Sequence, residues 1–197
     1  MKSILLSIRP QWLVKILNGE KTIEVRKLFP KDYVGWVYLY CSKNGGTLCP
    51  SYKSDNTMRY VVIKDKYDDV ITNGHIVARF WCDKVEEIKL WYSPAQADNC
   101  VDYDVWYHET ESLDDDELLY RSCLSGEKLI NYLCRKNNNE GYAIHISKLE
   151  IFDRPKELSE FHTVNKYGIP QYQFGKGTCD YKKITKAPQN YCYIEGE

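Results

Sequence analysis

The chain has 197 residues and a mass of 23.2 kDa, which is enough for one domain with a hydrophobic core. Hydrophobic residues make up 43% of the chain and charged residues 28%, a composition that excludes a disordered chain. No apolar run approaches the roughly 20 residues that span a bilayer, and the N-terminal apolar run is too short for a signal peptide. We therefore expect a cytoplasmic protein with no membrane partner.

Charge is distributed unevenly along the chain, although the net charge is only −1. Residues 1–31 contain seven basic and two acidic residues, whereas residues 83–117 contain twelve acidic residues and two lysines. Local electric fields of this kind govern the binding of polyanions. A basic body with an acidic segment can therefore bind polyanions differently from a protein whose charge is evenly distributed. The pattern keeps nucleic acid open as a class of partner.

The eight cysteines do not form a metal-binding pattern. No two of them have the spacing of two to four residues that is typical of a zinc knuckle, and there are only four histidines. Cys41 and Cys82 lie in apolar runs, where a free cysteine behaves as a small hydrophobic residue. We expect reduced thiols in the core, no metal and no cofactor, with disulfides or a metal site as the alternatives.

The first elements predicted in chain order are a strand, a helix and a second strand. Residues 4–8 form an apolar run of strand length, and Pro10 suits the first turn of a helix that Gly19 can end. Residues 22–26 alternate as a strand does, which places apolar side chains on one face. The other face of this strand carries Thr22, Glu24 and Arg26.

The remaining elements are mostly short strands. Such strands with few helices favour a small barrel or an α+β sheet over a parallel βαβ fold. We predict strands over 36–41, 60–63, 75–82 and 142–151, a helix over 126–134 and a short helical turn over 155–161.

We expect a single domain over residues 1–197, in which two segments stand apart. Residues 91–122 are acidic and aromatic and show no sustained hydrophobic periodicity, which indicates an insertion. The acidic run 114–117 within this segment suits the start of a helix. The tail over residues 165–197 interleaves lysines and tyrosines. This composition suits single-stranded nucleic acid, and it equally suits a tail packed on the domain with its lysines extended along it.

The densest group of chemically useful side chains lies in residues 18–27. A lysine that is partly desolvated can act as a base or nucleophile, which makes Lys21 a candidate catalytic residue. Glu24 can orient this lysine or exchange a proton with it, and Arg26 offers a planar fork for a phosphate. The alternative is an exposed strand face whose ion pairs contribute little.

The motif Gly19-x-Lys21-Thr22-x-Glu24-x-Arg26 follows Ser7-Ile8-Arg9-Pro10 and an amphipathic helix. In this combination it resembles the ASCH family of the PUA-like superfamily. The strand-like segments 74–82 and 141–146 and the segment 155–161 are also similar to that family. The closing segment 185–193 resembles the tail of ASCH proteins found in phage and prophage genomes, for which the host bacterial cytoplasm would be the location.

The resemblance implies a PUA-like β-barrel with flanking helices, and a cleft lined by the Gly-Lys-Thr segment. It also implies RNA or a nucleotide as the ligand. An enzyme of this family would be a metal-independent amidohydrolase acting on a modified nucleoside, or a ribonuclease, with Lys21 and Glu24 as the acid–base pair. Glu24 stands where the amidohydrolase branch has a second threonine, so binding is the leading hypothesis. Its candidate ligand-binding residues are Arg9, Thr22, Arg26, Lys27, Tyr142 and His145.

Two of these candidates have a structural alternative. Tyr142 could stack on a base, but aromatic residues in strands usually pack in the core. His145 faces away from Ile144, and it is either a structural histidine with hydrogen-bond partners or part of the site. The family's distant glutamate has three candidates, Glu86, Glu87 and Glu127. A third hypothesis is a protein-interaction module that uses residues 91–122 as its contact surface.

Overall fold

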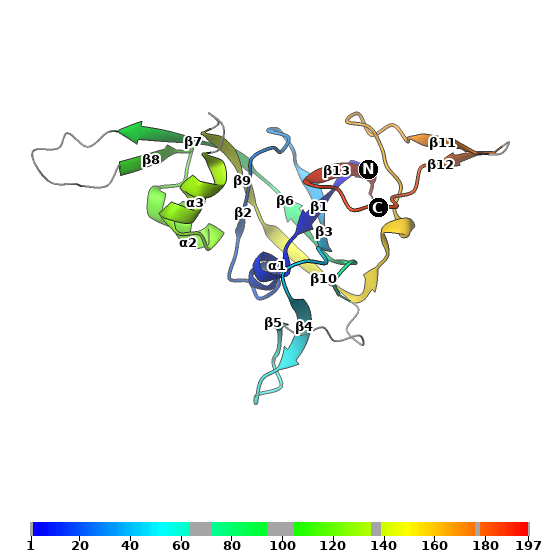
Figure 1. Cartoon of the computed structure of the whole chain (residues 1–197), viewed down its shortest axis with the longest axis horizontal. Coiled ribbons are helices and arrows are strands. Elements are labelled where there is room, and N and C mark those ends of the chain that lie inside the picture. Colours follow the sequence, from blue (N-terminus) through cyan, green and yellow to red (C-terminus); the bar gives the residue numbers. More distant parts are fainter. Residues whose placement is uncertain (1, 64–71, 94–104, 135–138, 176–177, 197) are drawn as a thin grey trace, which may run out of the picture. The chain divides into compact units, whose positions relative to one another are not determined.

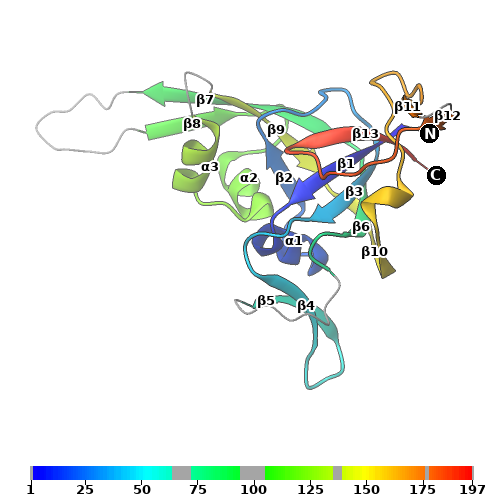
Figure 2. The ribbon, with the colours of Figure 1, turned by 45° about the vertical axis from the view of Figure 1, so that its right-hand side comes forward.

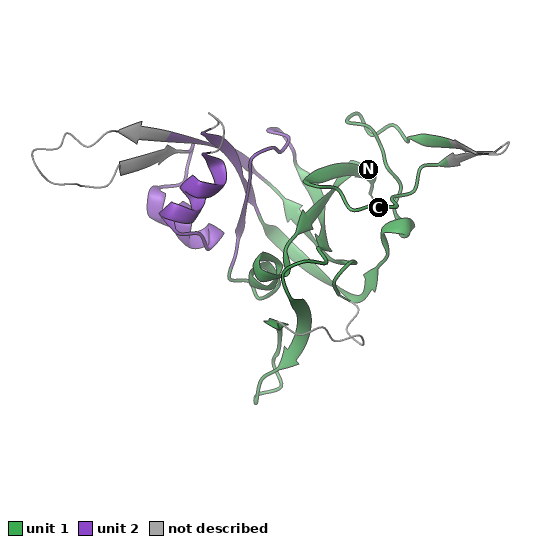
Figure 3. Cartoon of the chain, viewed as in Figure 1, with its two compact units in different colours: residues 1–20, 34–83, 146–197 green, residues 21–33, 84–145 purple. Residues whose placement is uncertain are grey.

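The computed structural model describes residues 2–63, 72–93, 105–134, 139–175 and 178–196. They form two compact units, each assembled from segments that are separated in the sequence (Figure 3). Unit 1 comprises residues 1–20, 34–83 and 146–197, and unit 2 comprises residues 21–33 and 84–145.

Unit 1 is built on a five-stranded sheet with the strand order β10-β6-β3-β1-β13 (Figures 1 and 2). Strands β1 and β3 run parallel, and the other neighbours are antiparallel. The central strands are almost entirely buried, which accounts for their continuous apolar sequence. The strands are β1 (Lys2–Ile8), β3 (Gly35–Cys41), β6 (Ile76–Cys82), β10 (Ser147–Lys156) and β13 (Tyr191–Glu195).

Helix α1 (Pro10–Leu17) follows β1 directly and confirms the predicted helix. Pro10 occupies its first turn, and the chain leaves the helix at Gly19, whose φ of 74° favours glycine. In the described residues of unit 1, two hairpins and one 3-10 turn accompany this sheet and helix. They are β4 (Thr47–Tyr52) with β5 (Met58–Ile63), β11 (Tyr172–Gly175) with β12 (Thr178–Tyr181), and η1 (Leu158–Glu160).

Unit 2 is a four-stranded antiparallel sheet with the order β2-β9-β7-β8, accompanied by two helices (Figure 1). Apolar residues of the sheet and of both helices share one core, which includes Ile23 and Val25 of the sheet and Leu118 and Leu129 of the helices. The elements are β2 (Ile23–Arg26), β7 (Val85–Ser93), β8 (Val105–Glu109), β9 (Glu140–His145), α2 (Asp115–Ser122) and α3 (Gly126–Leu133).

The predicted barrel is wrong. In the described part of the chain the strands form separate open sheets, because each strand order ends in edge strands that do not pair with each other. The prediction of one strand over residues 142–151 is also wrong. The chain leaves the unit 2 sheet after His145 and enters the unit 1 sheet at Ser147, so the segment is shared between β9 and β10. The sheet-dominated α+β class is confirmed.

The acidic segment is partly integral to unit 2. Leu113 and Leu118 are buried in the core, and Asp114 caps α2 by accepting a hydrogen bond from the Glu117 amide at 2.7 Å, which confirms the predicted helix start. Residues 94–104 of this segment lie outside the described residues, and its being an insertion stays a prediction. No helix in the described part of the chain has the length and apolar character of a membrane span.

Candidate functional site

Strand β2 presents the polar line that its sequence pattern predicts. Ile23 and Val25 point into the core of unit 2 and are at most 4% exposed. Because side chains alternate along a strand, Glu24 and Arg26 lie on the opposite face. Burial on one face therefore fixes the direction in which these two charged side chains point.

Lys21, Glu24 and Arg26 form a chain of ion pairs. The Lys21 ammonium lies 3.3 Å from Oε2 of Glu24, and Nε of Arg26 lies 2.9 Å from Oε1, so each carboxylate oxygen holds one cation. Lys21 Nζ also donates to the Ser122 carbonyl at 2.6 Å. The Lys21 side chain is 3% exposed, the Glu24 side chain 8% and the Arg26 side chain 13%, so access to solvent increases toward Arg26.

Tyr132 of α3 completes this group, which we call the β2 charge cluster (Lys21, Glu24, Arg26 and Tyr132). Burial raises the pKa of Tyr132; the nearby Glu24 raises it further, whereas Arg26 lowers it through its charge and a hydrogen bond. Lys27 Nζ lies 5.5 Å from the centroid of the Tyr132 ring, within the range of a cation–π interaction. The cluster and Lys27 together carry three cations and one carboxylate.

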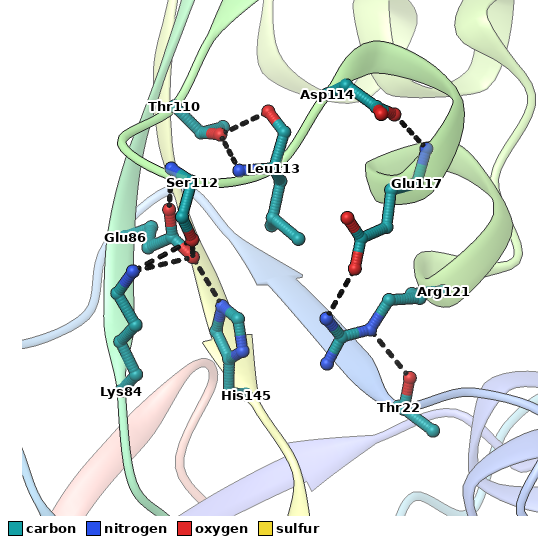
Figure 4. Close-up of polar contacts among 10 residues, drawn as sticks. All are labelled: Thr22, Lys84, Glu86, Thr110, Ser112, Leu113, Asp114, Glu117, Arg121 and His145. Carbon is teal, nitrogen blue, oxygen red and sulfur yellow. Dashed lines mark hydrogen bonds and ion pairs between the residues drawn. The ribbon is translucent and has the colours of Figure 1, made fainter.

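Thr22 has a structural contact instead of a position in this cluster. Its amide donates to the Arg121 carbonyl at 2.9 Å, and Arg121 Nε donates to Thr22 Oγ1 at 3.1 Å (Figure 4). Arg121 also pairs with Glu117 one turn earlier in α2, at 2.9 Å. Thr22 thus fixes the end of α2 against the start of β2, which places the Ser122 carbonyl that Lys21 contacts.

A second polar group surrounds Glu86 of β7, whose side chain is fully buried (Figure 4). His145 Nε2 lies 2.7 Å from Oε1 of Glu86, and the Lys84 ammonium lies 3.3 Å from the same oxygen. Ser112 donates its amide to Oε2 at 2.8 Å and its hydroxyl to Oε1 at 2.9 Å. We call Glu86, Lys84, Ser112 and His145 the Glu86 network.

The network keeps Glu86 ionised despite its burial. Burial raises the pKa of Glu86, but the hydrogen bonds from Ser112, Lys84 and His145 together outweigh burial, and its pKa is lowered. The carboxylate holds the start of the α2 segment on β7 through Ser112. The Glu86 network therefore has a structural role, because it connects β7 to the segment before α2. Within it, His145 is paired with Glu86.

The other predicted residues lie in different places. Tyr142 is directly opposite Arg26 in the β2–β9 register, so it shares the face of the β2 charge cluster. His145 is opposite Ile23 and so lies on the other face, with Glu86. Arg9 is exposed and precedes the first turn of α1 in unit 1. The cleft expected beside residues 19–22 stays a prediction.

Six cysteines of the described ranges are free thiols: Cys41, Cys49, Cys82, Cys123, Cys134 and Cys192. Burial raises the pKa of Cys41 to about 12 and that of Cys192 to about 11, so both thiols stay protonated at neutral pH. Within the ranges that the structure describes, no group of three or more His, Cys, Asp or Glu residues could hold a metal ion.

Sequence reasoning missed three partners of the candidate residues, namely Ser122, Arg121 and Tyr132. All three belong to α2 and α3, which the chain reaches long after β2. The helical spacing predicts that Leu129 and Leu133 face the core, and Tyr132 lies beside them on α3. No local pattern in the sequence indicates which strand that helix covers.

The fold is similar to that of a solved structure. The crystal structure of ASCH from Zymomonas mobilis aligns with a TM-score of 0.50 at 11% sequence identity, over 98% of this chain and 87% of that one. Two point mutants of the same bacterial protein, a serine-to-alanine and a tyrosine-to-phenylalanine variant, align at 13% identity with TM-scores of 0.49 and 0.44. These alignments cover 98% and 80% of this chain, and 88% and 77% of the mutant chains.

No family model matches the sequence, and no curated protein matches it either. At such low identity the structural likeness concerns the fold alone. The chain therefore has an ASCH-like fold, as the sequence resemblance implied.

Proposed function

We propose that this protein binds RNA or a nucleotide at the β2 charge cluster of unit 2. The observation that carries the proposal is the excess of positive charge around one carboxylate. Glu24 holds both Lys21 and Arg26, at 3.3 and 2.9 Å, and Lys27 adds a further cation beside Tyr132. A phosphate would supply the negative charge that Glu24 alone cannot.

The three cations have different roles in this proposal. Lys21 is the most buried and is engaged by Ser122 and Glu24, so it orients the carboxylate. Arg26 and Lys27 are partly exposed, and their side chains are the groups that a phosphate can reach. Tyr142 lies opposite Arg26 on the same face, and its role in this proposal is to contact a base.

A second candidate function is metal-independent hydrolysis of a modified nucleoside or of RNA. The observation that favours it is the contact between the Lys21 ammonium and Glu24 Oε2 at 3.3 Å, with both side chains nearly fully buried. An acid and a base held this close, away from water, can exchange a proton with a substrate. The same residues would then be the acid–base pair instead of an orienting pair.

The first experiment measures binding of nucleoside monophosphates and short RNAs to the full chain. Arg26→Gln should weaken binding by at least about tenfold, since a hydrogen bond to a charged group contributes about 1.5–3 kcal/mol. Lys15→Gln is the matched control, because Lys15 forms an exposed ion pair with Glu20 in unit 1. Unchanged binding by Arg26→Gln, with its fold intact by circular dichroism, would remove the cluster from the function.

Turnover of modified nucleosides and RNA distinguishes the two candidates. Glu24→Gln keeps the shape of the side chain but cannot accept a proton, so turnover should disappear if the protein is a hydrolase. Lys21→Arg keeps the charge but cannot act as a base near neutral pH, so a hydrolase that uses Lys21 as its base should keep binding and lose turnover in this variant. Binding without turnover in the wild-type protein leaves the binding function standing and excludes hydrolysis of the substrates tested.

A further inference from the structure

The C-terminal part of unit 1 carries aromatic rings that are open to solvent. Tyr167 is 74% exposed, Tyr172 49% and Tyr181 47%. Burying a tyrosine stabilises a fold because the large apolar area of its ring is removed from water. These three tyrosines therefore contribute little to the core, unlike Tyr38 and Tyr40 of β3, which are at most 5% exposed.

Two of the open rings are stacked on each other. Tyr172 of β11 and Tyr181 of β12 are paired in antiparallel register, with ring centroids 5.2 Å apart and an angle of 26° between the ring planes. The His162 ring lies 5.7 Å from that of Tyr181. A stack that exists before binding loses little conformational freedom when a further planar group is added.

Lysines accompany the rings and give this region an excess of positive charge. Residues 162–186 contain five lysines and one acidic residue, Asp180. Lys166 Nζ lies 5.0 Å from the centroid of the Tyr167 ring. Lys182 and Lys183 directly follow Tyr181 and are exposed.

Main-chain hydrogen bonds hold these side chains on a common framework. The Thr163 amide donates to the Lys182 carbonyl at 2.9 Å, and the Lys182 amide donates to the Gln171 carbonyl at 2.8 Å. A bridge between His162 and Lys183 continues this pairing. The segment is therefore folded onto unit 1, while its rings remain open.

The competing interpretation is a tail that packs on the domain with its lysines extended along it. It fits a different part of the tail over residues 165–197. Tyr191 and Tyr193 of β13 contact each other edge to face with centroids 5.8 Å apart, and Lys2 Nζ lies 4.7 Å from the Tyr193 ring centroid. Both tyrosines are partly buried. That interpretation leaves the exposure of Tyr167, Tyr172 and Tyr181 unexplained.

We propose that this region, the tyrosine–lysine surface (Tyr167, Tyr172, Tyr181, Lys166, Lys182 and Lys183), binds single-stranded nucleic acid. Bases stack on the open rings, and the lysines neutralise phosphates. The surface belongs to unit 1 and shares no residue with the β2 charge cluster of unit 2. A duplex would hide the faces of its bases, and an acidic polypeptide would leave the rings unused, so single-stranded nucleic acid is the occupant that uses both features.

The test is binding of a fluorescein-labelled oligo(U) of about 12 nucleotides to the full chain, followed by fluorescence anisotropy at several salt concentrations. The double variant Tyr172→Ala/Tyr181→Ala should weaken binding by roughly tenfold or more, whereas Tyr172→Phe/Tyr181→Phe should retain it, because the ring is what stacks. Lys182→Gln/Lys183→Gln should reduce the slope of log affinity against log salt by about 1.4.

The matched control is Tyr52→Ala/Lys53→Gln on the β4–β5 hairpin, where Tyr52 is 71% exposed and Lys53 is exposed. This variant should bind like the wild type. Wild-type affinity in Tyr172→Ala/Tyr181→Ala would overturn the proposal. So would equal wild-type affinity for poly-glutamate or for a duplex of the same length, or no binding of oligo(U) at low salt.

Arg26→Gln in the same assay separates this proposal from the function proposed for unit 2. If Arg26→Gln loses oligo(U) binding and Tyr172→Ala/Tyr181→Ala does not, the tyrosine–lysine surface is excluded and the β2 charge cluster stands. If only the tyrosine variant loses binding, the surface stands. Binding of nucleoside monophosphates then decides on the cluster alone.

Discussion

Burial changes what the charged side chain of Lys21 contributes to the stability of the fold. The family resemblance implies a lysine that lines a cleft, and the alternative is an exposed strand face whose ion pairs contribute little. In the structure its ammonium is held between Glu24 and the Ser122 carbonyl, and the side chain is 3% exposed. Removing one partner of a buried ion pair destabilises a fold far more than removing an exposed one. Binding by any Lys21 variant therefore has to be measured together with its thermal unfolding.

The lowered pKa of Glu86 predicts how the stability of unit 2 depends on pH. Hydrogen bonds from Ser112, Lys84 and His145 outweigh burial and lower its pKa in the folded state. The unfolded chain therefore takes up this proton at a higher pH than the folded chain does. The stabilisation is complete above the unfolded value of about 4.3 and is lost as pH falls through the lowered folded value.

The measurement is the free energy of unfolding in urea between pH 7 and pH 3. Glu86→Gln should lose this part of the acid dependence and should be less stable at pH 7, because a neutral amide holds Lys84 and His145 less strongly. Glu111→Gln, at the exposed position directly before Ser112, is the control. An identical loss of stability with acid in wild type and Glu86→Gln would contradict the argument.

The residue pattern of β2 was predictable, and its surroundings were not. Alternation alone separates Ile23 and Val25 from Glu24 and Arg26, because the period of a strand is two. The partners Ser122 and Tyr132 depend on how α2 and α3 pack on the sheet. That packing is decided by tertiary contacts, which a local pattern does not contain.

Among the elements, those with strong local signals were predicted. Helix α1 has Pro10 at its start and Gly19 after its end, and α3 has Leu129 and Leu133 at helical spacing. The break between β9 and β10 was missed, since residues 142–151 are suited to a strand throughout. The change of sheet at Ile146 is set by the neighbours on either side, β2 and β7 in one sheet and β6 in the other.

Helix α2 should depend on its N-terminal cap. Asp114 accepts a hydrogen bond from the Glu117 amide at 2.7 Å, and this first turn positions Leu118 in the core. Asp114→Ala should lower the free energy of unfolding by about 1 kcal/mol. Asp115→Ala, one residue later and exposed, changes a similar charge and should cost clearly less. Equal values for the two variants in urea unfolding would show that the cap bond is unimportant.

On the scale of the whole molecule, the acidic segment concentrates negative charge in one stretch of the chain. Residues 98–117 contain nine acidic residues and no lysine or arginine. Deleting them would also remove β8, Leu113 and the cap at Asp114, so a deletion would test folding instead of charge. Neutralising exposed Asp115 and Asp116 keeps these structural roles and changes the net charge from −1 to +1.

We expect Asp115→Asn/Asp116→Asn to raise the affinity for a single-stranded oligonucleotide on the order of twofold at low salt. The gain should disappear at about 1 M salt, where screening shortens the range of charges to about 3 Å. Anisotropy titrations at both salt concentrations measure it. A gain of the same size at both concentrations would indicate a direct contact in place of a long-range effect.

The route of the chain through the two units has a consequence for the order of folding. The chain enters unit 2 at residue 21, leaves at 33, enters again at 84 and leaves at 145. In unit 1, β1 pairs with β13 near the other end of the chain, and β6 pairs with β10 across the whole second excursion. During synthesis β7, β8, α2, α3 and β9 emerge as one continuous stretch, with β2 already made, so unit 2 can assemble first. In the unit 1 sheet, β6 and β1 lack their outer neighbours β10 and β13 until these last strands are made. We therefore expect the sheet to be completed slowly, with a period in which its unpaired strands are exposed to misassembly.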